Sequence, residues 1–231
     1  MTPTRRPARL ALTALPIVLL AGALSAQQPQ PQHRPDHLQH RFDDPERFAR
    51  GFDDPARDAW QMPDRVIAAL GLRADSTVAD IGAGTGYFSL RLAHAVPRGT
   101  VFAVDVEPAM LEHIRTRATG AHVANIVTVL AAADSPNLPK PVDVVLIVNT
   151  YHHLPSRPAY FRNLRSFLAP GGAVAIIDLK KNAPSGPPVE FRFEPAQIAA
   201  EMAEAGYRLA ATHDFLPYQH FLVFRPEGAG R

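Results

Sequence analysis

The sequence contains no cysteine. This absence excludes disulfide bonds, thiolate metal sites and cysteine nucleophiles, and it is compatible with any redox compartment. Charged residues make up only 20% of the 231 positions, and no basic run follows the first ten residues. Without Arg5, Arg6 and Arg9 the chain has 21 basic and 22 acidic residues. We therefore expect no nucleic-acid partner.

The first 26 residues resemble an export signal. Three arginines in the first ten positions precede an uncharged apolar stretch at 10–24, and small residues are concentrated at 21–26. The apolar stretch is short for a spanning helix and contains Pro16, so we expect only transient membrane contact through this segment. The protein would then be exported, either periplasmic or secreted. The alternative is a misassigned start codon on a cytoplasmic enzyme.

The length favours one domain with appendages. After the signal at 1–26, we expect a disordered linker rich in Gln, Pro and His at 27–40. A helical extension at 41–59 follows, then the main domain at 60–226 and a tail at 227–231. The oligomeric state is not predicted from these patterns.

The helical extension contains a tandem repeat. Residues 41–47 are echoed at 51–57, and each copy contains Phe-Asp-Asp-Pro. An Asp before a Pro suits an N-cap followed by the first helical position, so we expect two short capped helices. Phe42, Phe48 and Phe52 would pack against the domain. The extension could instead be a lid over a site, and the sequence does not separate these two roles.

From Thr77 onward, strand-like and helix-like segments alternate, which is typical of a parallel sheet covered on both faces. A loop is expected at 134–141, which contains three prolines. Two last strands joined by a short link, 207–215 and 220–224, must be antiparallel. The other expected strands are 77–81, 100–104, 126–130, 142–148 and 173–178, and the expected helices are 64–70, 87–95, 108–118, 157–168 and 196–205.

One stretch, Asp80-Ile-Gly-Ala-Gly-Thr-Gly86, organises the chain. It places glycines at alternate positions between a buried strand and a helix that begins near Tyr87. Glycine has no Cβ, so the backbone can approach a ligand closely, and the helix N-terminus directs N–H groups toward it. The spacing does not fit the dinucleotide fingerprint, whose last glycine would fall on the bulky Tyr87.

This Asp-x-Gly-x-Gly-x-Gly pattern resembles motif I of class I S-adenosylmethionine (SAM)-dependent methyltransferases. The segment 168–172 is also similar to the Leu-x-Pro-Gly-Gly turn of that family. The resemblance covers roughly residues 60–226. It implies a Rossmann-like three-layer α/β sandwich, with a parallel sheet closed by a C-terminal antiparallel hairpin. It also implies a SAM-dependent enzyme that transfers a methyl group to a small-molecule acceptor by in-line displacement. An export signal departs from the family pattern.

The resemblance assigns cofactor-binding residues at successive strand ends. Gly82, Gly84 and Gly86 would lie under the amino acid and ribose parts of SAM, with Asp80 beside them. A carboxylate after the second strand, Asp105, would accept hydrogen bonds from both ribose hydroxyls.

Two further strand ends complete the expected cofactor site. Asp134 would accept from the exocyclic amine of adenine, and Asn149 would face the methionyl part of the cofactor or the acceptor. Capping of the segments that follow is an alternative reason for Asp105 and for Asp134.

The segment Tyr151-His152-His153-Leu154 follows Asn149, where an acceptor should approach. An acceptor that carries a proton needs a base, so His152 or His153 is the candidate catalytic residue. Alternatively, a histidine here only caps or packs the loop. We assign no metal site. The alternative function is a catalytically silent SAM- or nucleoside-binding protein that acts as a sensor or partner, and the glycine spacing disfavours a nicotinamide-dependent oxidoreductase.

Overall fold

The structure is a computed structural model and describes residues 44–228. The expected export signal at 1–26, the linker at 27–40 and Phe42 lie outside the described residues. Among the helices of residues 44–228, none is both long and apolar enough to cross a membrane.

Seven strands form one sheet, in the order β3-β2-β1-β4-β5-β7-β6. Strands β1 to β5 pair in parallel, whereas β7 runs antiparallel to both of its neighbours, β5 and β6. The expected closing hairpin is therefore present, and its second strand lies inside the sheet while its first strand forms the edge. The strands are β1 Thr77–Ile81, β2 Thr100–Asp105, β3 Ile126–Leu130, β4 Val142–Val148, β5 Leu168–Leu179, β6 Tyr207–His213 and β7 Gln219–Pro226.

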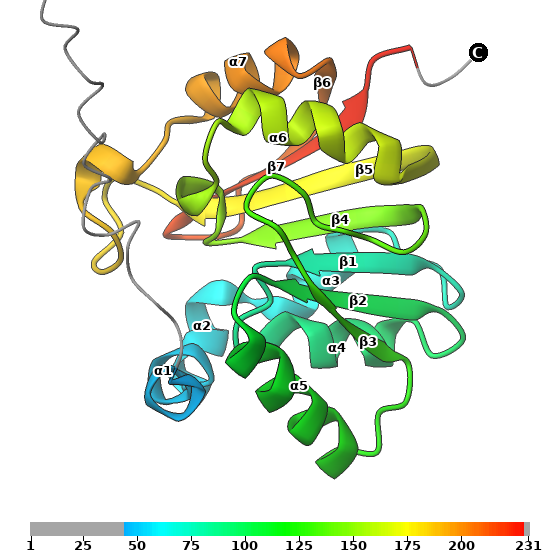
Figure 1. Cartoon of the computed structure of the whole chain (residues 1–231). Helices are drawn as coiled ribbons and strands as arrows, with labels where there is room; N and C mark the ends of the chain where they lie inside the picture. The colour runs from blue at the N-terminus through cyan, green and yellow to red at the C-terminus, as the bar shows by residue number, and fades with distance from the viewer. Residues whose placement is uncertain (1–43, 229–231) are drawn as a thin grey trace, which may run out of the picture. The chain divides into compact units, whose positions relative to one another are not determined.

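Helices cover both faces of this sheet, which gives three layers (Figure 1). Helices α6 and α7 pack on one face, and α3, α4 and α5 pack on the other. The helices are α1 Pro45–Phe52, α2 Asp58–Gln61, α3 Pro63–Ala69, α4 Tyr87–Ala95, α5 Pro108–Gly120, α6 Arg157–Leu164 and α7 Pro195–Glu204. Short 3₁₀ turns are η2 Pro55–Arg57, η3 Tyr151–His153, η4 Arg165–Phe167 and η5 Val189–Phe191.

The central strand β4 shows why the sheet must be covered on both sides. Its residues Val145 and Ile147 join the core cluster beneath α6 and α7, while Val144, Leu146 and Val148 join the cluster beneath α3 and α4. All five are apolar and at most 9% exposed. Side chains of a strand alternate between faces, so a continuous apolar run requires two apolar cores.

The proline-rich crossover after β3 is a loop, as expected. Leu138 within it is buried in the same core cluster as Phe102 and Val104, on the face that α6 and α7 cover. Three prolines prevent a long helix here, so one buried leucine supplies apolar cover where a crossover helix would otherwise lie.

Several expected boundaries were wrong. The expected helix at 157–168 ends at Leu164, turns through η4 and gives way to β5 at Leu168. Leu168 pairs with Val142 and Ala173 with Val144, so the Pro-Gly-Gly segment between them forms a bulge inside β5. This pairing starts β5 five residues earlier than expected. The last two strands, expected at 207–215 and 220–224, are 207–213 and 219–226.

The repeated Asp-Pro pairs cap the helices of the extension as expected. The Asp44 carboxylate accepts a hydrogen bond from the Arg47 N–H, and the Asp54 carboxylate accepts one from the Ala56 N–H. The first copy starts the α-helix α1, whereas the second starts only the 3₁₀ turn η2.

The turn before β2 generates a stability prediction. A Cβ on Gly99 would lie 1.9 Å from the backbone oxygen of Ser76, which accepts the Thr100 N–H bond. Gly99→Ala must therefore shift the turn, and we expect a loss of about 1–3 kcal/mol in the free energy of unfolding, measured by urea titration. Gly120→Ala, at the end of α5 with nothing within 4 Å of the new methyl group, is the matched control and should keep or raise stability, by up to about 1 kcal/mol. Equal effects of the two substitutions would contradict this account.

Candidate active site

The glycine turn joins β1 to α4 at the carboxyl edge of the sheet. Its three glycines adopt the left-handed conformation, with φ values of +73° at Gly82, +55° at Gly84 and +86° at Gly86. The N–H groups of Gly82 and Ala83 both donate to the carbonyl oxygen of Val104 in β2. The turn is therefore fixed to the neighbouring strand through its own backbone.

Two of the glycines make room for protein side chains. A Cβ on Gly82 would lie 2.2 Å from the Thr150 hydroxyl oxygen, and one on Gly86 would lie 3.0 Å from Ile114 of α5. We expected bare backbone at all three positions to face a ligand. At Gly82 and Gly86 the absent side chain instead allows the loop after β4 and helix α5 to pack against the turn.

Gly84 lies between a carboxylate and an aromatic ring. Its N–H donates to the Asp105 Oδ2 atom at 2.8 Å, and a Cβ at this position would meet the Phe52 ring at 3.4 Å. The other carboxylate oxygen of Asp105 accepts from the Glu107 N–H at 3.0 Å. The Val106 N–H is a third backbone donor to this carboxylate. Two oxygens offer about four acceptor positions, so at most one stays open. Burial raises the pKa of Asp105, which is 9% exposed, and its hydrogen bonds to backbone N–H groups oppose that shift.

Two apolar side chains beside Asp105 were missed by the sequence reasoning. Val106 is 55% exposed, and Leu130, which pairs with Asp105 across β2 and β3, is 53% exposed. Exposed aliphatic side chains next to a carboxylate suit a nucleoside. The aliphatic groups can pack against its flat base, and the carboxylate can accept from a hydroxyl of the attached ribose. The sequence did contain a signal for one of them, because Val106 directly follows the predicted ribose ligand Asp105.

Asp80 lies at the end of β1, beneath the turn, and is 3% exposed. The Ser89 hydroxyl of α4 donates to its Oδ2 atom at 2.6 Å. Burial raises the pKa of Asp80 to about 6, although the bond from Ser89 favours the ionised form. The side chain therefore ties β1 to α4, and its role toward a cofactor stays a prediction.

Asp134 lies in the loop that follows β3. Its side chain is exposed, and its carbonyl oxygen accepts a hydrogen bond from the Asn163 amide of α6 at 3.1 Å. This loop begins at Ala131, directly after β3, and the Ala131 N–H donates to the Asp105 carbonyl at the end of β2. The assignment of Asp134 to the adenine amine stays a prediction.

Asn149 follows β4 and also has a positive φ, +52°. Its N–H donates to Ile177 of β5, and its side-chain oxygen accepts from Gln219 at 2.8 Å. Gln219 in turn accepts from Gln61 at 2.6 Å, and both glutamines are fully buried. The end of β4 is thereby joined to β7 and to α2.

His152 is paired with a buried carboxylate that the sequence reasoning missed. Its Nδ1 atom lies 3.1 Å from both carboxylate oxygens of Asp178, which is 1% exposed. The N–H groups of His152 and Leu179 also donate to this carboxylate. An ionised carboxylate only accepts hydrogen bonds, so Nδ1 carries the proton and Nε2 is the nitrogen that can take one up. The signal was available, because Asp178 lies near the end of an expected strand.

The second candidate base, His153, lies against the first. Its ring centroid is 4.2 Å from that of His152, and its side chain is only partly buried. The catalytic role of either histidine stays a prediction.

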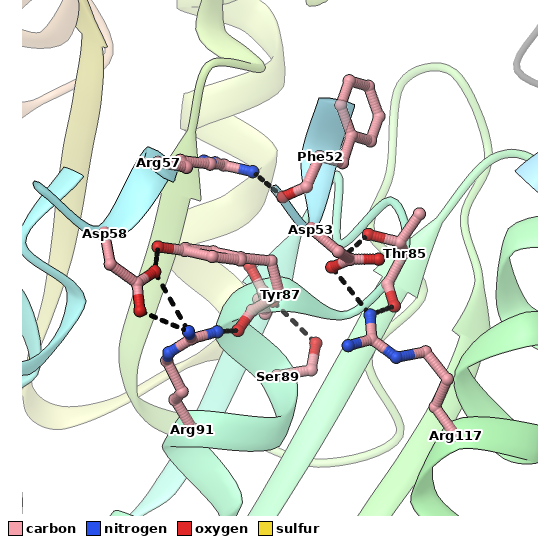
Figure 2. A network of polar contacts seen from close by, with 10 residues as sticks. Phe52, Asp53, Arg57, Asp58, Thr85, Tyr87, Ser89, Arg91 and Arg117 are labelled. Carbon is pink, nitrogen blue, oxygen red and sulfur yellow. Dashed lines mark hydrogen bonds and ion pairs between the residues drawn. The ribbon is translucent and has the colours of Figure 1, made fainter. Parts of the chain in front are cut away.

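The N-terminal extension is fastened to the glycine turn by polar contacts (Figure 2). The Asp53 carboxylate accepts from the Thr85 hydroxyl at 3.0 Å and from Arg117 of α5 at 2.8 Å. Arg117 also donates to the Thr85 carbonyl at 2.6 Å. A residue of the extension therefore holds the turn from outside.

Tyr87, the first residue of α4, is the second point of attachment (Figure 2). Its ring lies between the guanidinium groups of Arg57 and Arg91, each with its central carbon 4.0 Å from the ring centroid. The Tyr87 hydroxyl donates to Asp58, which also pairs with Arg91 at 3.1 Å. No residue from 44 to 60 is buried, so this segment is held mainly by polar and cation–π contacts. It packs directly on the expected cofactor turn, which is consistent with either role expected for it.

The raised pKa of Asp80 gives a prediction about stability. Between the ordinary pKa of 3.8 and about 6, the folded protein binds a proton that the unfolded chain lacks, so stability falls as pH rises through this window. We expect Asp80→Asn to gain stability relative to the wild type by on the order of 2–3 kcal/mol between pH 4 and pH 7, measured by urea unfolding. Asp75→Asn, whose side chain is 61% exposed, is the control. A difference between wild type and Asp80→Asn that is independent of pH would refute this origin of the shift.

Comparison with known proteins agrees with this geometry. Residues 78–172 match the family model described as a methyltransferase domain. The chain is 34% identical over 121 residues to the 27-O-demethylrifamycin SV methyltransferase of Amycolatopsis mediterranei, covering 51% of this chain and 44% of that protein. It is 30% identical over 126 residues to the ubiquinone/menaquinone biosynthesis C-methyltransferase UbiE of Cupriavidus taiwanensis, covering 53% and 50%. The chain spans about half the length of these curated relatives.

One solved structure covers more of the chain. The crystal structure of a SAM-dependent methyltransferase from Aquifex aeolicus matches with a TM-score of 0.72 and 26% identity, covering 78% of this chain and 97% of that one. The expected fold class is confirmed. The described domain has the Rossmann-like fold of SAM-dependent methyltransferases, and residues 78–172 within it match their methyltransferase domain.

Proposed function

We propose that this protein is a SAM-dependent methyltransferase that acts on a small-molecule acceptor. The observation that carries the proposal is the arrangement at one edge of the sheet. A glycine turn bonded to Asp105 and a histidine oriented by Asp178 both lie at the carboxyl ends of parallel strands. Ligands of open α/β sheets bind at this edge.

The residues of the turn suit the parts of SAM. Asp105 lies beside the turn and accepts from three backbone N–H groups, which leaves its carboxylate one further acceptor position for a ribose hydroxyl. The exposed side chains of Val106 and Leu130 would cover the adenine ring. SAM supplies a methyl group on a sulfonium cation, which is already a good leaving group. The chain therefore mainly has to hold donor and acceptor in line and keep water out.

His152 is the residue that we propose as the base. It is 5% exposed, and Asp178 fixes its ring so that Nε2 is available to accept a proton from the acceptor. Asp178 acts as a positioning residue, because its carboxylate holds the tautomer and orientation of the imidazole. His153 remains the second candidate base, since it stacks on His152.

A base favours an acceptor that loses a proton, such as a hydroxyl or an acidic carbon. One similar protein is named as a 27-O-demethylrifamycin SV methyltransferase and another as a C-methyltransferase. Similarity therefore does not select between oxygen and carbon as the acceptor atom. The near-balanced charge of the chain after its first ten residues argues against nucleic acid as the acceptor.

The competing function is that of a SAM- or nucleoside-binding protein that does not catalyse methyl transfer. The buried His152–Asp178 pair favours the enzyme, because a protein that only binds SAM has no need for a buried histidine oriented by a carboxylate. Export also remains a proposal. It is supported by the pattern of residues 1–26, and it raises the question of how a cytosolic cofactor would be supplied.

The test combines binding and turnover. We expect the full chain to bind SAM and its demethylated product S-adenosylhomocysteine by calorimetry, and to transfer labelled methyl groups from SAM to a compound in a small-molecule extract of the source organism. His152→Ala and Asp178→Asn should lower kcat by about 10²–10⁴-fold without loss of S-adenosylhomocysteine binding. His153→Ala tests the second candidate.

His94→Ala is the matched control, because this exposed histidine on α4 bonds only its own helix backbone at Leu90 among the contacts described. Full turnover by His152→Ala would remove that residue as the base. Failure of the wild type to bind either nucleoside would overturn the proposed function itself.

A further inference from the structure

Three side-chain amides form a hydrogen-bonded row that ends at an arginine. The Gln219 amide donates to the Asn149 oxygen at 2.8 Å, and the Gln61 amide donates to the Gln219 oxygen at 2.6 Å. The Gln61 oxygen accepts from two nitrogens of Arg57, Nε at 3.3 Å and Nη2 at 3.2 Å. We call this row, Arg57–Gln61–Gln219–Asn149, the amide relay.

Arg57 fixes the direction of the amide relay. An amide can be turned over, which exchanges its oxygen and nitrogen, so its orientation must follow from its partners. A guanidinium has only donors, which means that Gln61 must present its oxygen to Arg57 and its NH₂ group to Gln219. Gln219 accepts from Gln61 through its oxygen, so it presents its NH₂ group to Asn149. Asn149 must therefore accept from Gln219 through its own oxygen. Its own NH₂ group therefore points away from Gln219.

The arginine is itself held in place. Its third nitrogen, Nη1, donates to the Phe52 carbonyl at 2.7 Å, and the guanidinium lies over the Tyr87 ring. Gln61 and Gln219 are fully buried, so water does not compete for their hydrogen bonds. Reversing the relay would place the Gln61 NH₂ group against the guanidinium, donor against donor.

The free end of the relay lies next to the glycine turn. Asn149 follows β4, which pairs with β1, and the next residue, Thr150, fills the space beside Gly82. Asn149 has a left-handed φ of +52°, a conformation that Asn adopts more readily than most residues other than glycine. Asn149 thus offers hydrogen-bond donors where the amino acid tail of the cofactor was expected.

That tail contains one group that accepts hydrogen bonds, its carboxylate, because its ammonium group only donates and its sulfur is a cation. We propose that the amide relay presents the Asn149 NH₂ group to the carboxylate of SAM. Arg57, Gln61 and Gln219 are then positioning residues. The inference rests on the proposed function. It gives the N-terminal extension a defined role, because Arg57 lies in the extension and Gln61 directly follows it.

The test compares two ligands that differ only in this tail. S-adenosylhomocysteine has the carboxylate, whereas 5′-methylthioadenosine has the same nucleoside without the amino acid. In Gln61→Glu the new carboxylate still accepts from Arg57 but cannot donate to Gln219. The Gln219 amide must then turn over, so that its NH₂ group donates to the new carboxylate and its oxygen faces Asn149. Asn149 must turn in response and donate its NH₂ group to the Gln219 oxygen. We expect the ratio of the two Kd values to shift by about 10- to 100-fold against S-adenosylhomocysteine, with little change in the Kd of 5′-methylthioadenosine.

Gln197→Glu is the matched control, because it makes the same chemical change on the exposed side of α7, where Gln197 bonds Glu201. Its Kd ratio should equal that of the wild type. Arg57→Met is the second variant and removes the anchor of the relay without placing a charge in the buried part. It should shift the ratio in the same direction, and Arg57→Lys, which is again a donor only, should restore part of the difference.

The outcomes separate the two proposals. Calorimetry on the full chain gives the Kd ratio within each variant, and this ratio does not depend on the fraction of protein that is folded. If the wild type binds neither ligand, the proposed function fails. If the wild type binds both ligands but Gln61→Glu and Arg57→Met leave the ratio unchanged, or weaken both ligands equally, the relay proposal is overturned and the proposed function stands. If Gln61→Glu does not fold, Arg57→Met decides alone.

Discussion

Parallel pairing of β1 with β2 and β4 is the constraint on which the site depends. It brings three strand ends to one edge, so that residues far apart in sequence lie within hydrogen-bond distance. The bond from the Gly84 N–H to Asp105 joins the first two strand ends, and the packing of Thr150 against Gly82 joins the first to the third. A ligand at this edge would meet an already ordered backbone, which lowers the entropy cost of binding.

Two buried carboxylates show how differently the same group is used at this edge. Asp80 accepts from the hydroxyl and from the backbone N–H of Ser89, and its burial raises its pKa to about 6. Asp178 accepts from two backbone N–H groups and from the His152 ring. The first carboxylate joins β1 to the helix that follows it, whereas the second orients a potential base. The elements that donate to each carboxylate separate the two roles: α4 at Asp80, and the η3 histidine at Asp178.

The N-terminal extension lacks a buried apolar face, yet it reaches deep into the domain through polar groups. Asp53 and Asp58 pair with arginines of α5 and α4, and Gln61 enters the core to bond Gln219. Such a segment depends on hydrogen bonds and ion pairs whose net contribution is modest, so it is expected to open more readily than the sheet beneath it. Its polar contacts reach the glycine turn at Thr85 and the first residue of α4, Tyr87.

Local patterns were enough to predict the existence of the sheet strands, most helices and the glycine turn, because apolar runs, Asp-Pro caps and alternating glycines act locally. Strands β1, β3 and β4 lie at the residues expected, 77–81, 126–130 and 142–148. The same patterns placed Asp105, Asn149 and His152 at or close to strand ends, where the structure has them. Their partners follow from the packing of the whole domain: Thr150 beside Gly82, Asp178 beside His152, and the row of amides from Asn149 to Arg57. These contacts join segments up to 158 residues apart, as between Gln61 and Gln219, and no local pattern records which side chains the sheet will bring together.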